Sequence, residues 1–407
     1  MFRISLVFLL IVVGYLAQGQ DVEGLKTNCL SISTSIEVGS KELSSKFINK
    51  YFNGGTIDQA TKDAFFDKLN SKNTAGAFWE SEVKIKRFST KSTDLNRSYQ
   101  MIGFENYYLY EAEFSKDLFG LYFYGNRKYE DKTADLSNMH FKQNKFQIFK
   151  LGIYQRLQNF GLGINAGLVI GQNTLEINTL ESSIYTAPMG RFLDVKLHAE
   201  SKSTDLKSDK FLSNQGNGIS VDFKLEYTLK EDSKVGISAN RLGFVNYTKN
   251  TTMQRVDSNF HFEGLEITNI LDSFAINLTT PEELKDDLVH TSNLSHIRKS
   301  LPTQYSLYLK YWFLNNKFLL NSKLVLIPST VYKPSFQVDL NTKILNLLYV
   351  GVGGGVGGFS SWNMGLNAGF KLGSFISVQA EAKSLFNIYN LNNPASIMGA
   401  IRIGINF

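Results

Sequence analysis

The side chains best suited to chemistry in this 407-residue sequence are five histidines and a single cysteine. His290 and His296 are the closest histidine pair, in "HTSNLSH". Their spacing matches no face of a helix or strand, whereas a zinc site needs closely spaced ligands on a rigid element. We therefore interpret both as solvated loop residues. Cys29 has no second cysteine to pair with, so no internal disulfide can form. The sequence predicts no metal site and no cofactor.

A serine nucleophile with a histidine base is a second arrangement to consider, and His198 and Ser201 in "DVKLHAES" are its candidates. Residues three apart in a strand point to opposite faces, which breaks the geometry that such a pair needs. The glycine-rich run Gly351–Gly358 lies within a strand pattern, where glycine permits close packing or curvature, and is not a phosphate loop. We predict no catalytic residues, so the protein is not expected to be an enzyme.

The composition points to the class of protein. The chain is 43% hydrophobic and 13% aromatic, with 32 glycines, 6 prolines and a net charge of +6. Its basic residues are not concentrated in one patch, as a nucleic-acid interface requires, so we expect no nucleic-acid partner.

The first 19 residues have the plan of a secretory signal peptide. Arg3 precedes the apolar stretch Leu6–Val13, and Ala17–Gly19 forms a small-x-small cleavage site. The apolar stretch is shorter than the roughly 20 residues of a transmembrane helix. We predict an exported protein with a signal peptide at 1–19; a short membrane anchor is the alternative.

Strands with one apolar face recur along the rest of the chain. In "ISVDFKLEYTLK" (219–230) and "WNMGLNAGFKL" (362–372), apolar residues alternate with polar or small ones, the period of a half-buried strand. Helical patterns are few and short, at 56–70, 115–126 and 279–288, and we place them in connections. The fold class is therefore all-β.

Polar residues on one face of these strands predict a wet or ion-paired interior. Mixed charges at similar heights indicate a lumen crossed by salt bridges and water. The predicted lumen-lining residues are Asp222, Lys224, Glu226, Gln337, Asp339, Asn341, Lys343, Gln379, Glu381, Lys383 and Arg402.

Short turns alternating with long polar connections are typical of a transmembrane antiparallel β-barrel. The predicted short turns lie near 157–159, 230–233, 315–316, 346 and 373. We predict about 14 strands, in a range of 12 to 16. The barrel should span 81–407, and 20–80 should form an N-terminal segment with a short helix, lumenal or plug-like. A soluble sandwich or lipocalin-like barrel also alternates in this way, but the aromatic residues near strand ends favour the membrane barrel.

The chain ends on the alternating strand "IMGAIRIGINF". Its apolar face includes Ile401, Ile403, Ile405 and Phe407. This ending resembles the C-terminal signal that the barrel-assembly machinery recognises in outer-membrane proteins. "FFDKLNSKNTAGAFWESEVKIKRF", "SKDLFGLYFYGN" and "SLPTQYSLYLKYWF" resemble an uncharacterised outer-membrane barrel family of Bacteroidota, similar in plan to the FadL-type fatty-acid channels. The resemblance implies location in the outer membrane, contact with its lipid, and biogenesis through that machinery.

Two functions are compatible with these patterns. By resemblance to the FadL-type plan, the first is a passive channel or transporter for small, hydrophobic molecules. The alternative is a plugged barrel that acts as a structural or accessory subunit of an outer-membrane complex, with envelope-complex partners docked on its long loops.

Replacing Phe407 with Asp should lower the amount of assembled barrel in the outer membrane, because the terminal strand closes the barrel and carries the aromatic signal. Membrane fractionation with immunoblotting measures this, with Phe407→Tyr as the aromatic control. Equal levels of the Asp and Tyr variants would contradict the assignment of the signal.

Overall fold

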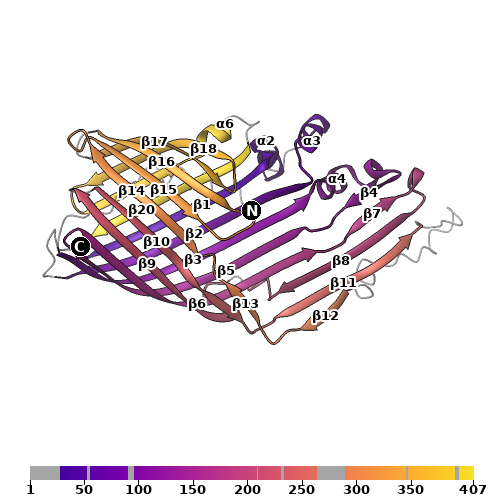
Figure 1. Cartoon of the computed structure of the whole chain (residues 1–407), viewed down its shortest axis with the longest axis horizontal. Helices are drawn as coiled ribbons and strands as arrows, with labels where there is room; N and C mark the ends of the chain where they lie inside the picture. The colour runs from indigo at the N-terminus through magenta and orange to yellow at the C-terminus, as the bar shows by residue number, and fades with distance from the viewer. Residues whose placement is uncertain are drawn as a thin grey trace.

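The computed structural model describes residues 28–52, 56–89, 96–208, 210–230, 233–263, 289–344, 347–389 and 394–407. The predicted signal peptide and the predicted helix at 279–288 lie outside the described residues. The strands form one antiparallel sheet that closes into a barrel of 14 strands, as the sequence predicted (Figure 1).

Each barrel strand pairs with the next along the chain, and the last pairs with the first. In order around the barrel they are β1 (Cys29–Ser44), β2 (Lys72–Phe88), β3 (Asn96–Ser115), β5 (His140–Leu157), β6 (Phe160–Thr179), β9 (Gly216–Lys230), β10 (Ser233–Tyr247), β14 (Gln304–Phe313), β15 (Phe318–Leu326), β16 (Lys333–Ile344), β17 (Leu348–Gly358), β18 (Trp362–Leu372), β19 (Ile376–Ala382) and β20 (Pro394–Asn406). Closure comes from β1 and β20, which pair from Cys29 opposite Asn406 to Val38 opposite Ile397.

The prediction of a lumenal or plug-like segment at 20–80 is wrong. Its first described element is the barrel strand β1, which is hydrogen-bonded to β20 on one side and β2 on the other. In "CLSISTSIEVGSKELS" isoleucines on the outer face alternate with serines and Glu37, so the segment has the same period-two pattern as the other strands. The barrel therefore begins at Cys29 and not at 81.

An apolar belt surrounds the barrel. The outward positions of the strands carry exposed aliphatic side chains, and the inward positions carry glycine, polar and charged ones. Members of the belt include Ile32, Ile85, Ile102, Leu151, Ile153, Leu162, Ile219, Leu225, Ile237, Leu307, Leu340, Val352 and Leu366. A belt of this kind matches the hydrocarbon layer that a closed barrel must face.

The two ends of the barrel differ in their connections. The short turns 158–159, 314–317 and 373–375 lie at the end that holds Phe407, and the turns at 231–232 and 345–346 fall outside the described residues. We call this the C-terminal end. The long connections lie at the other end, called here the loop end (Figure 1).

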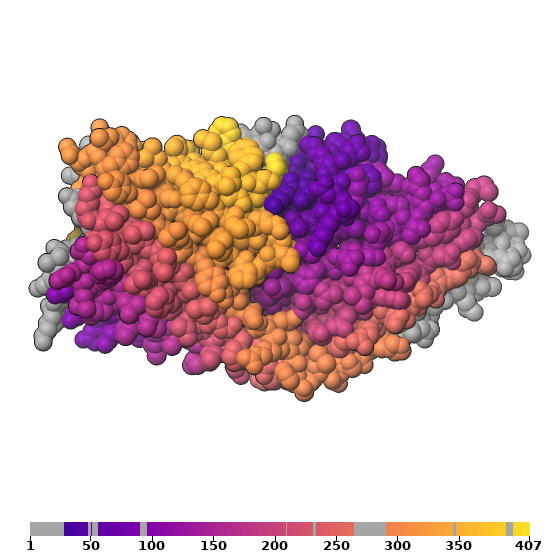
Figure 2. Space-filling view, in the orientation of Figure 1, coloured from indigo at the N-terminus to yellow at the C-terminus, as the bar shows by residue number. Residues whose placement is uncertain are grey.

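A curved extension of the sheet projects from the loop end. Strand β6 pairs with β9 as far as Gly171, and from Leu175 onward it pairs with β8 instead. The extension, called here the wing, comprises the outer parts of β5 and β6 together with β4 (Lys132–Asp135), β7 (Ser183–Thr186), β8 (Leu193–Ser203), β11 (Thr252–Phe262) and β12 (Val289–Asn293). A further short strand, β13 (Ile297–Ser300), pairs with the end of β10. Figure 2 shows the wing reaching well beyond the barrel.

The helices are short and lie in connections. They are α2 (Ser45–Phe52), α3 (Gln59–Phe66), α4 (Lys116–Tyr124) and α6 (Leu385–Tyr389), with 3-10 turns η1 (Asn126–Tyr129) and η2 (Pro188–Gly190). Ser115 caps α4 by accepting a hydrogen bond from Leu118 N, and Gly125 ends it at a φ of 73°. Apolar side chains of α2, α3 and α4 form one small cluster at the rim. Among the described residues, no helix has both the length and the hydropathy to cross a membrane.

Replacing Leu225 with Arg should destabilise the barrel by about 2–4 kcal/mol, because this side chain faces outward near the middle of β9. The control is Lys224→Arg, which changes the inward neighbour and keeps its charge. Urea titrations of both variants refolded into lipid vesicles measure the free energies of unfolding. Equal losses would show that the two faces are assigned wrongly.

Candidate functional site

The interior of the barrel is crossed by a buried ionic layer centred on Arg241 of β10. Its guanidinium donates to Glu105 on β3 (Nη1 to Oε1, 2.9 Å) and to Glu80 on β2 (Nη1 to Oε2, 3.2 Å). Both Arg241 and Glu105 have side chains that are 1% exposed. Strands β10 and β2 are separated by four strands around the shorter side of the barrel, so this contact spans the lumen.

The local backbone explains how Arg241 reaches the lumen. The register of β10 against β9 shifts between Ala239 and Leu242, and Arg241 has a φ of 61°. Such a bulge removes the residue from the ladder and re-aims its side chain. Its N–H, which the ladder no longer uses, donates to Asp222 Oδ1 at 2.8 Å.

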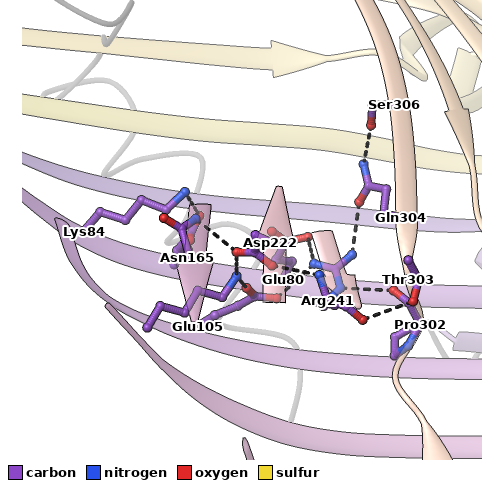
Figure 3. A network of polar contacts seen from close by, with 12 residues as sticks. Glu80, Lys84, Glu105, Asn165, Asp222, Arg241, Pro302, Thr303, Gln304 and Ser306 are labelled. Carbon is purple, nitrogen blue, oxygen red and sulfur yellow. Dashed lines mark hydrogen bonds and ion pairs between the residues drawn. The ribbon is translucent and has the colours of Figure 1, made fainter. Parts of the chain in front are cut away.

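Arg241 also binds the connection that lies opposite it in the sheet. Residues 300–304, which we call the strap, join β13 to β14 along β10: Ser300 lies opposite Phe244, Leu301 N donates to the carbonyl of Gly243, and Gln304 lies opposite Asn240. Arg241 Nε donates to the carbonyl of Pro302 (3.2 Å), and Nη2 donates to Gln304 Oε1 (3.0 Å). Thr303 Oγ1 returns a bond to the carbonyl of Arg241 (3.1 Å). Figure 3 shows the strap and the carboxylates meeting on this one side chain.

A second cation completes the layer. Lys150 of β5 is buried, forms an ion pair with Glu105, and lies 2.7 Å from Asp222 Oδ2. Asn165 Nδ2 also donates to Asp222 Oδ2 (3.3 Å). Each buried carboxylate of the layer therefore has a cationic or amide partner, the condition under which charges persist in a protein interior.

An apolar plug lies above this layer, toward the loop end. It combines inward side chains of the strands with side chains of three inward-folded connections. Its buried members are Tyr107, Leu109, Phe146, Ile148, Val169, Val245, Tyr247, Ile297, Leu301, Val325, Ile327, Val331, Tyr332 and Phe359. Phe359 N donates to Glu37 Oε1 on β1 (3.0 Å), and Ser329 donates to Glu111 on β3, so these connections are tied to the strands around them.

Below the ionic layer, toward the C-terminal end, Glu226 collects four donors. Its carboxylate accepts from Tyr308 (2.6 Å) and Tyr154 (3.1 Å) and lies near the ammonium groups of Lys224 (3.0 Å) and Lys234 (3.2 Å). The predicted residues Asp222, Lys224 and Glu226 thus lie on one strand face but in two layers.

The other predicted charges meet on the opposite wall. Lys383 Nζ lies 2.9 Å from Asp339 Oδ2 and 3.5 Å from Glu381 Oε2, and Glu381 also pairs with Arg402. Glycine on β17 makes this possible, because a Cβ at Gly353 would lie 1.9 Å from Asp339 Oδ1. The glycine run therefore makes room for polar side chains, in line with its interpretation as a close-packing strand.

The remaining predicted lumen residues have weaker contacts. Gln379 donates to Glu381 (3.1 Å) and Gln337 to Ser335 (3.3 Å), while Asn341 accepts a long bond from Asn367 (3.5 Å). Lys343 is half-buried near the C-terminal end of β16. Residues Ile401, Ile403 and Ile405 lie on β20 within the closing pair with β1, and Phe407 exchanges backbone hydrogen bonds with Asn28.

The histidines do not form a site. Nε2 of His198 lies 2.9 Å from Asp257, the residue opposite it on β11, and its ladder position leaves Ser201 on the other face. On the wing, a hydrogen bond with Asp194 raises the pKa of His261. Within the described part of the chain, no group of three or more His, Cys, Asp or Glu residues could hold a metal ion.

The residues at the centre of the layer were missed by sequence reasoning. Glu105 and Lys150 lie on strands whose two faces both carry large apolar residues, so period two does not single them out. Glu80 lies in the alternating run "WESEVKIKRF" but was not among the predicted lumen residues. Arg241 lies on a bulge, which breaks the alternation in "ISANRLGF". The sequence shows that these residues are charged, but it does not show that they are buried in the lumen.

Residues 28–378 match DUF5723, a family of unknown function, so the chain belongs to that family. The predicted membership in an uncharacterised barrel family is confirmed, while the origin in Bacteroidota stays a prediction. The comparison with curated proteins gave no match.

Comparison with solved structures gave distant likenesses. The toluene transporter TodX of Pseudomonas putida is 8% identical, with 94% of this chain and 90% of that chain covered and a TM-score of 0.43. The translocator domain of the autotransporter NalP of Neisseria meningitidis is 9% identical, with coverages of 95% and 90% and a TM-score of 0.34. Both are structures that the chain resembles in outline only.

Replacing Arg241 with Met should cost about 3–5 kcal/mol of stability, because Glu105 would remain charged, buried and short of one partner. Adding Glu105→Gln to this variant should recover part of the loss. The matched control is Arg402→Met, whose pair with Glu381 is half-exposed on the arginine side and should contribute about 1 kcal/mol or less. Unfolding titrations in lipid measure all three; equal costs for Arg241 and Arg402 would contradict a buried central layer.

Proposed function

We propose that this DUF5723 protein is an outer-membrane barrel with a closed lumen, and that it serves as a structural or accessory subunit of an envelope complex. The observation that carries the proposal is the cross-section at Arg241. The buried guanidinium of Arg241 ties β2 and β3 to the strap, the backbone N–H of Arg241 donates to Asp222 on β9, and an apolar plug packs directly above them. A passive channel needs a continuous water-filled path, and a buried, ion-paired layer opposes one.

The orientation follows from the connections. In outer-membrane barrels the short turns face the periplasm and the long loops face outward. The C-terminal end is then periplasmic, and the wing stands outside the cell. Biogenesis through the barrel-assembly machinery belongs to the same proposal, with β20 and Phe407 as the recognised strand.

The wing supplies the proposed docking surface. Its inner face carries paired charges from two strands: Arg255 lies 3.0 Å from Glu200, and Lys202 lies 2.7 Å from the same carboxylate. These hydrogen bonds, the one from Lys202 foremost, lower the pKa of Glu200, which keeps it charged. A rigid sheet with exposed charges of both signs suits an electrostatically selected protein partner.

A second candidate function is gated passage of a small molecule, and one cavity favours it. About 170 Å³ of space adjoins the strap at the loop end of the lumen. Leu109, Leu301 and Ile327 contribute apolar walls, and the ion pair of Glu111 with Lys142 (3.1 Å) contributes a polar one. Under this hypothesis, the strap would open when its bonds to Arg241 are exchanged for bonds to a ligand.

Planar-bilayer recording and liposome swelling separate the two functions. The closed-subunit proposal expects no conductance and no solute uptake from the wild-type barrel. The positive control is a variant in which the plug side chains Tyr332 and Phe359 are replaced by Ala. It should leak ions, which would show that the assay detects an opening. Steady conductance or swelling by the wild type would overturn the closed-subunit proposal in favour of a transporter.

The same barrel can be isolated from membranes in mild detergent after crosslinking. The proposal expects a stoichiometric envelope protein to co-migrate with it, and a variant with Glu200→Lys and Arg255→Glu to lose or weaken that association. Co-migration that is indifferent to these charges would count against the wing as the docking surface.

A further inference from the structure

The connection between β8 and β9 lies outside the barrel wall. It covers residues 204–215, of which residue 209 is outside the described part, and we call it the outer loop. It is attached to the wall by regular bonds: Thr204 N donates to the carbonyl of Thr174 (3.0 Å), and Gln215 N donates to the carbonyl of Gly171 (2.8 Å). Both of these acceptors lie on β6 where the wing departs from the barrel.

Side chains of the wall hold the middle of the outer loop. Gln172 donates to the carbonyl of Lys210 (2.8 Å), Asn173 donates to that of Ser208 (3.4 Å), and Gln147 accepts from Leu212 N (3.1 Å). Gln147, Gln172 and Asn173 are no more than 3% exposed, so the loop replaces water as their partner. The outer loop therefore has a defined position against the wall.

The outer loop nevertheless presents large apolar side chains to its surroundings. Phe211 is 70% exposed, and Leu206 and Leu212 are both exposed as well. The ring of Phe211 packs at 5.5 Å from Phe104, which in turn lies 5.0 Å from Phe149. Phe104 and Phe149 occupy outward positions of β3 and β5, in continuity with the apolar belt.

An aromatic pair on β2 and β3 shows how high the contact between Phe211 and Phe104 lies along the barrel axis. Trp79 and Tyr108 stack at 5.6 Å on the outer face, and Lys145 lies over the ring of Tyr108. Exposed Trp and Tyr of barrels gather at the membrane–water interface. Phe104 lies four residues closer to the C-terminal end than Tyr108, roughly 13 Å along β3. Phe211 thus reaches below the aromatic pair, to the level of the hydrocarbon.

We propose that the outer loop is a lipid-binding element, with Phe211 inserted among the acyl chains of the adjacent leaflet. The occupant is lipid because the exposed ring continues the lipid-facing belt and lies below the interfacial aromatic pair. Burying a phenylalanine side chain in hydrocarbon is favourable, and the bonds of the loop to β5 and β6 transmit that anchorage to the base of the wing. The proposal does not depend on whether the lumen conducts.

A single-cysteine probe tests this directly. In a Cys29→Ser background, the variant Phe211→Cys is labelled with an environment-sensitive fluorophore and refolded into vesicles that contain acyl-chain-brominated phosphatidylcholine. The control is Leu180→Cys, an exposed site on the wing that lies nine residues beyond Gly171, roughly 30 Å along the strand direction. We expect a blue-shifted emission and several-fold stronger quenching at 211 than at 180.

Equal, weak quenching at the two sites would overturn the proposal and leave Phe211 as a water-exposed contact of Phe104. Unlabelled Phe211→Glu and Phe211→Leu variants provide a second measurement that is independent of the fluorophore. Photo-crosslinking to a diazirine-bearing phospholipid should occur at the peptide that contains residue 211 in the wild type and in Phe211→Leu, and should fall several-fold in Phe211→Glu. Equal crosslinking of that peptide in all three would also contradict insertion.

Discussion

A guanidinium that has lost all contact with water must find acceptors for its donors, and this requirement at Arg241 organises the interior of the barrel. Its acceptors come from β2, β3 and the strap, and its backbone groups are satisfied by Asp222 and Thr303. No two of these partners are neighbours in sequence apart from those in the strap. The bulge on β10 has a cost in backbone conformation, which the four hydrogen bonds of the Arg241 side chain offset.

The layers on either side of Arg241 reinforce one another. The apolar plug excludes water from the upper face of the ionic layer, and a lower local dielectric strengthens each ion pair while making any unpaired charge more costly. The Glu226 cluster below keeps two lysines and two tyrosines in fixed positions on the lower side. The apolar plug, the ionic layer of Arg241 and the ionic cluster of Glu226 thus follow one another along the barrel axis, from the loop end to the C-terminal end.

The strands extend to different heights around the barrel. Strands β5 and β6 continue past the rim into the wing, whereas the strands from β14 to β19 end near it. The inner face of the wing carries the paired charges of Glu200, Lys202 and Arg255. The outer loop lies where β6 exchanges β9 for β8 as its neighbour, at the junction of the barrel and the wing.

Much of the architecture follows from local sequence patterns. Period-two alternation is a property of the chain itself, so the all-β class, the 14 strands, the short turns and the two capped helices near 59 and 116 were predictable. Alternation also placed Asp222, Glu226, Asp339 and Glu381 on the polar face. The same alternation, of serines with isoleucines, is present in β1, although this strand was predicted to be part of a lumenal or plug-like segment.

Only the tertiary structure decided which polar residues meet and what fills the lumen. Periodicity reports the face on which a side chain lies, but closure of the sheet decides which residues on distant strands come within 3 Å. Arg241 pairs with residues 136 and 161 positions away in the chain, and its own position breaks the alternation. The plug depends on connections folding inward, and loop residues carry no periodic signal of their direction. The ionic layer and the apolar plug are therefore made of long-range contacts that no local pattern encodes.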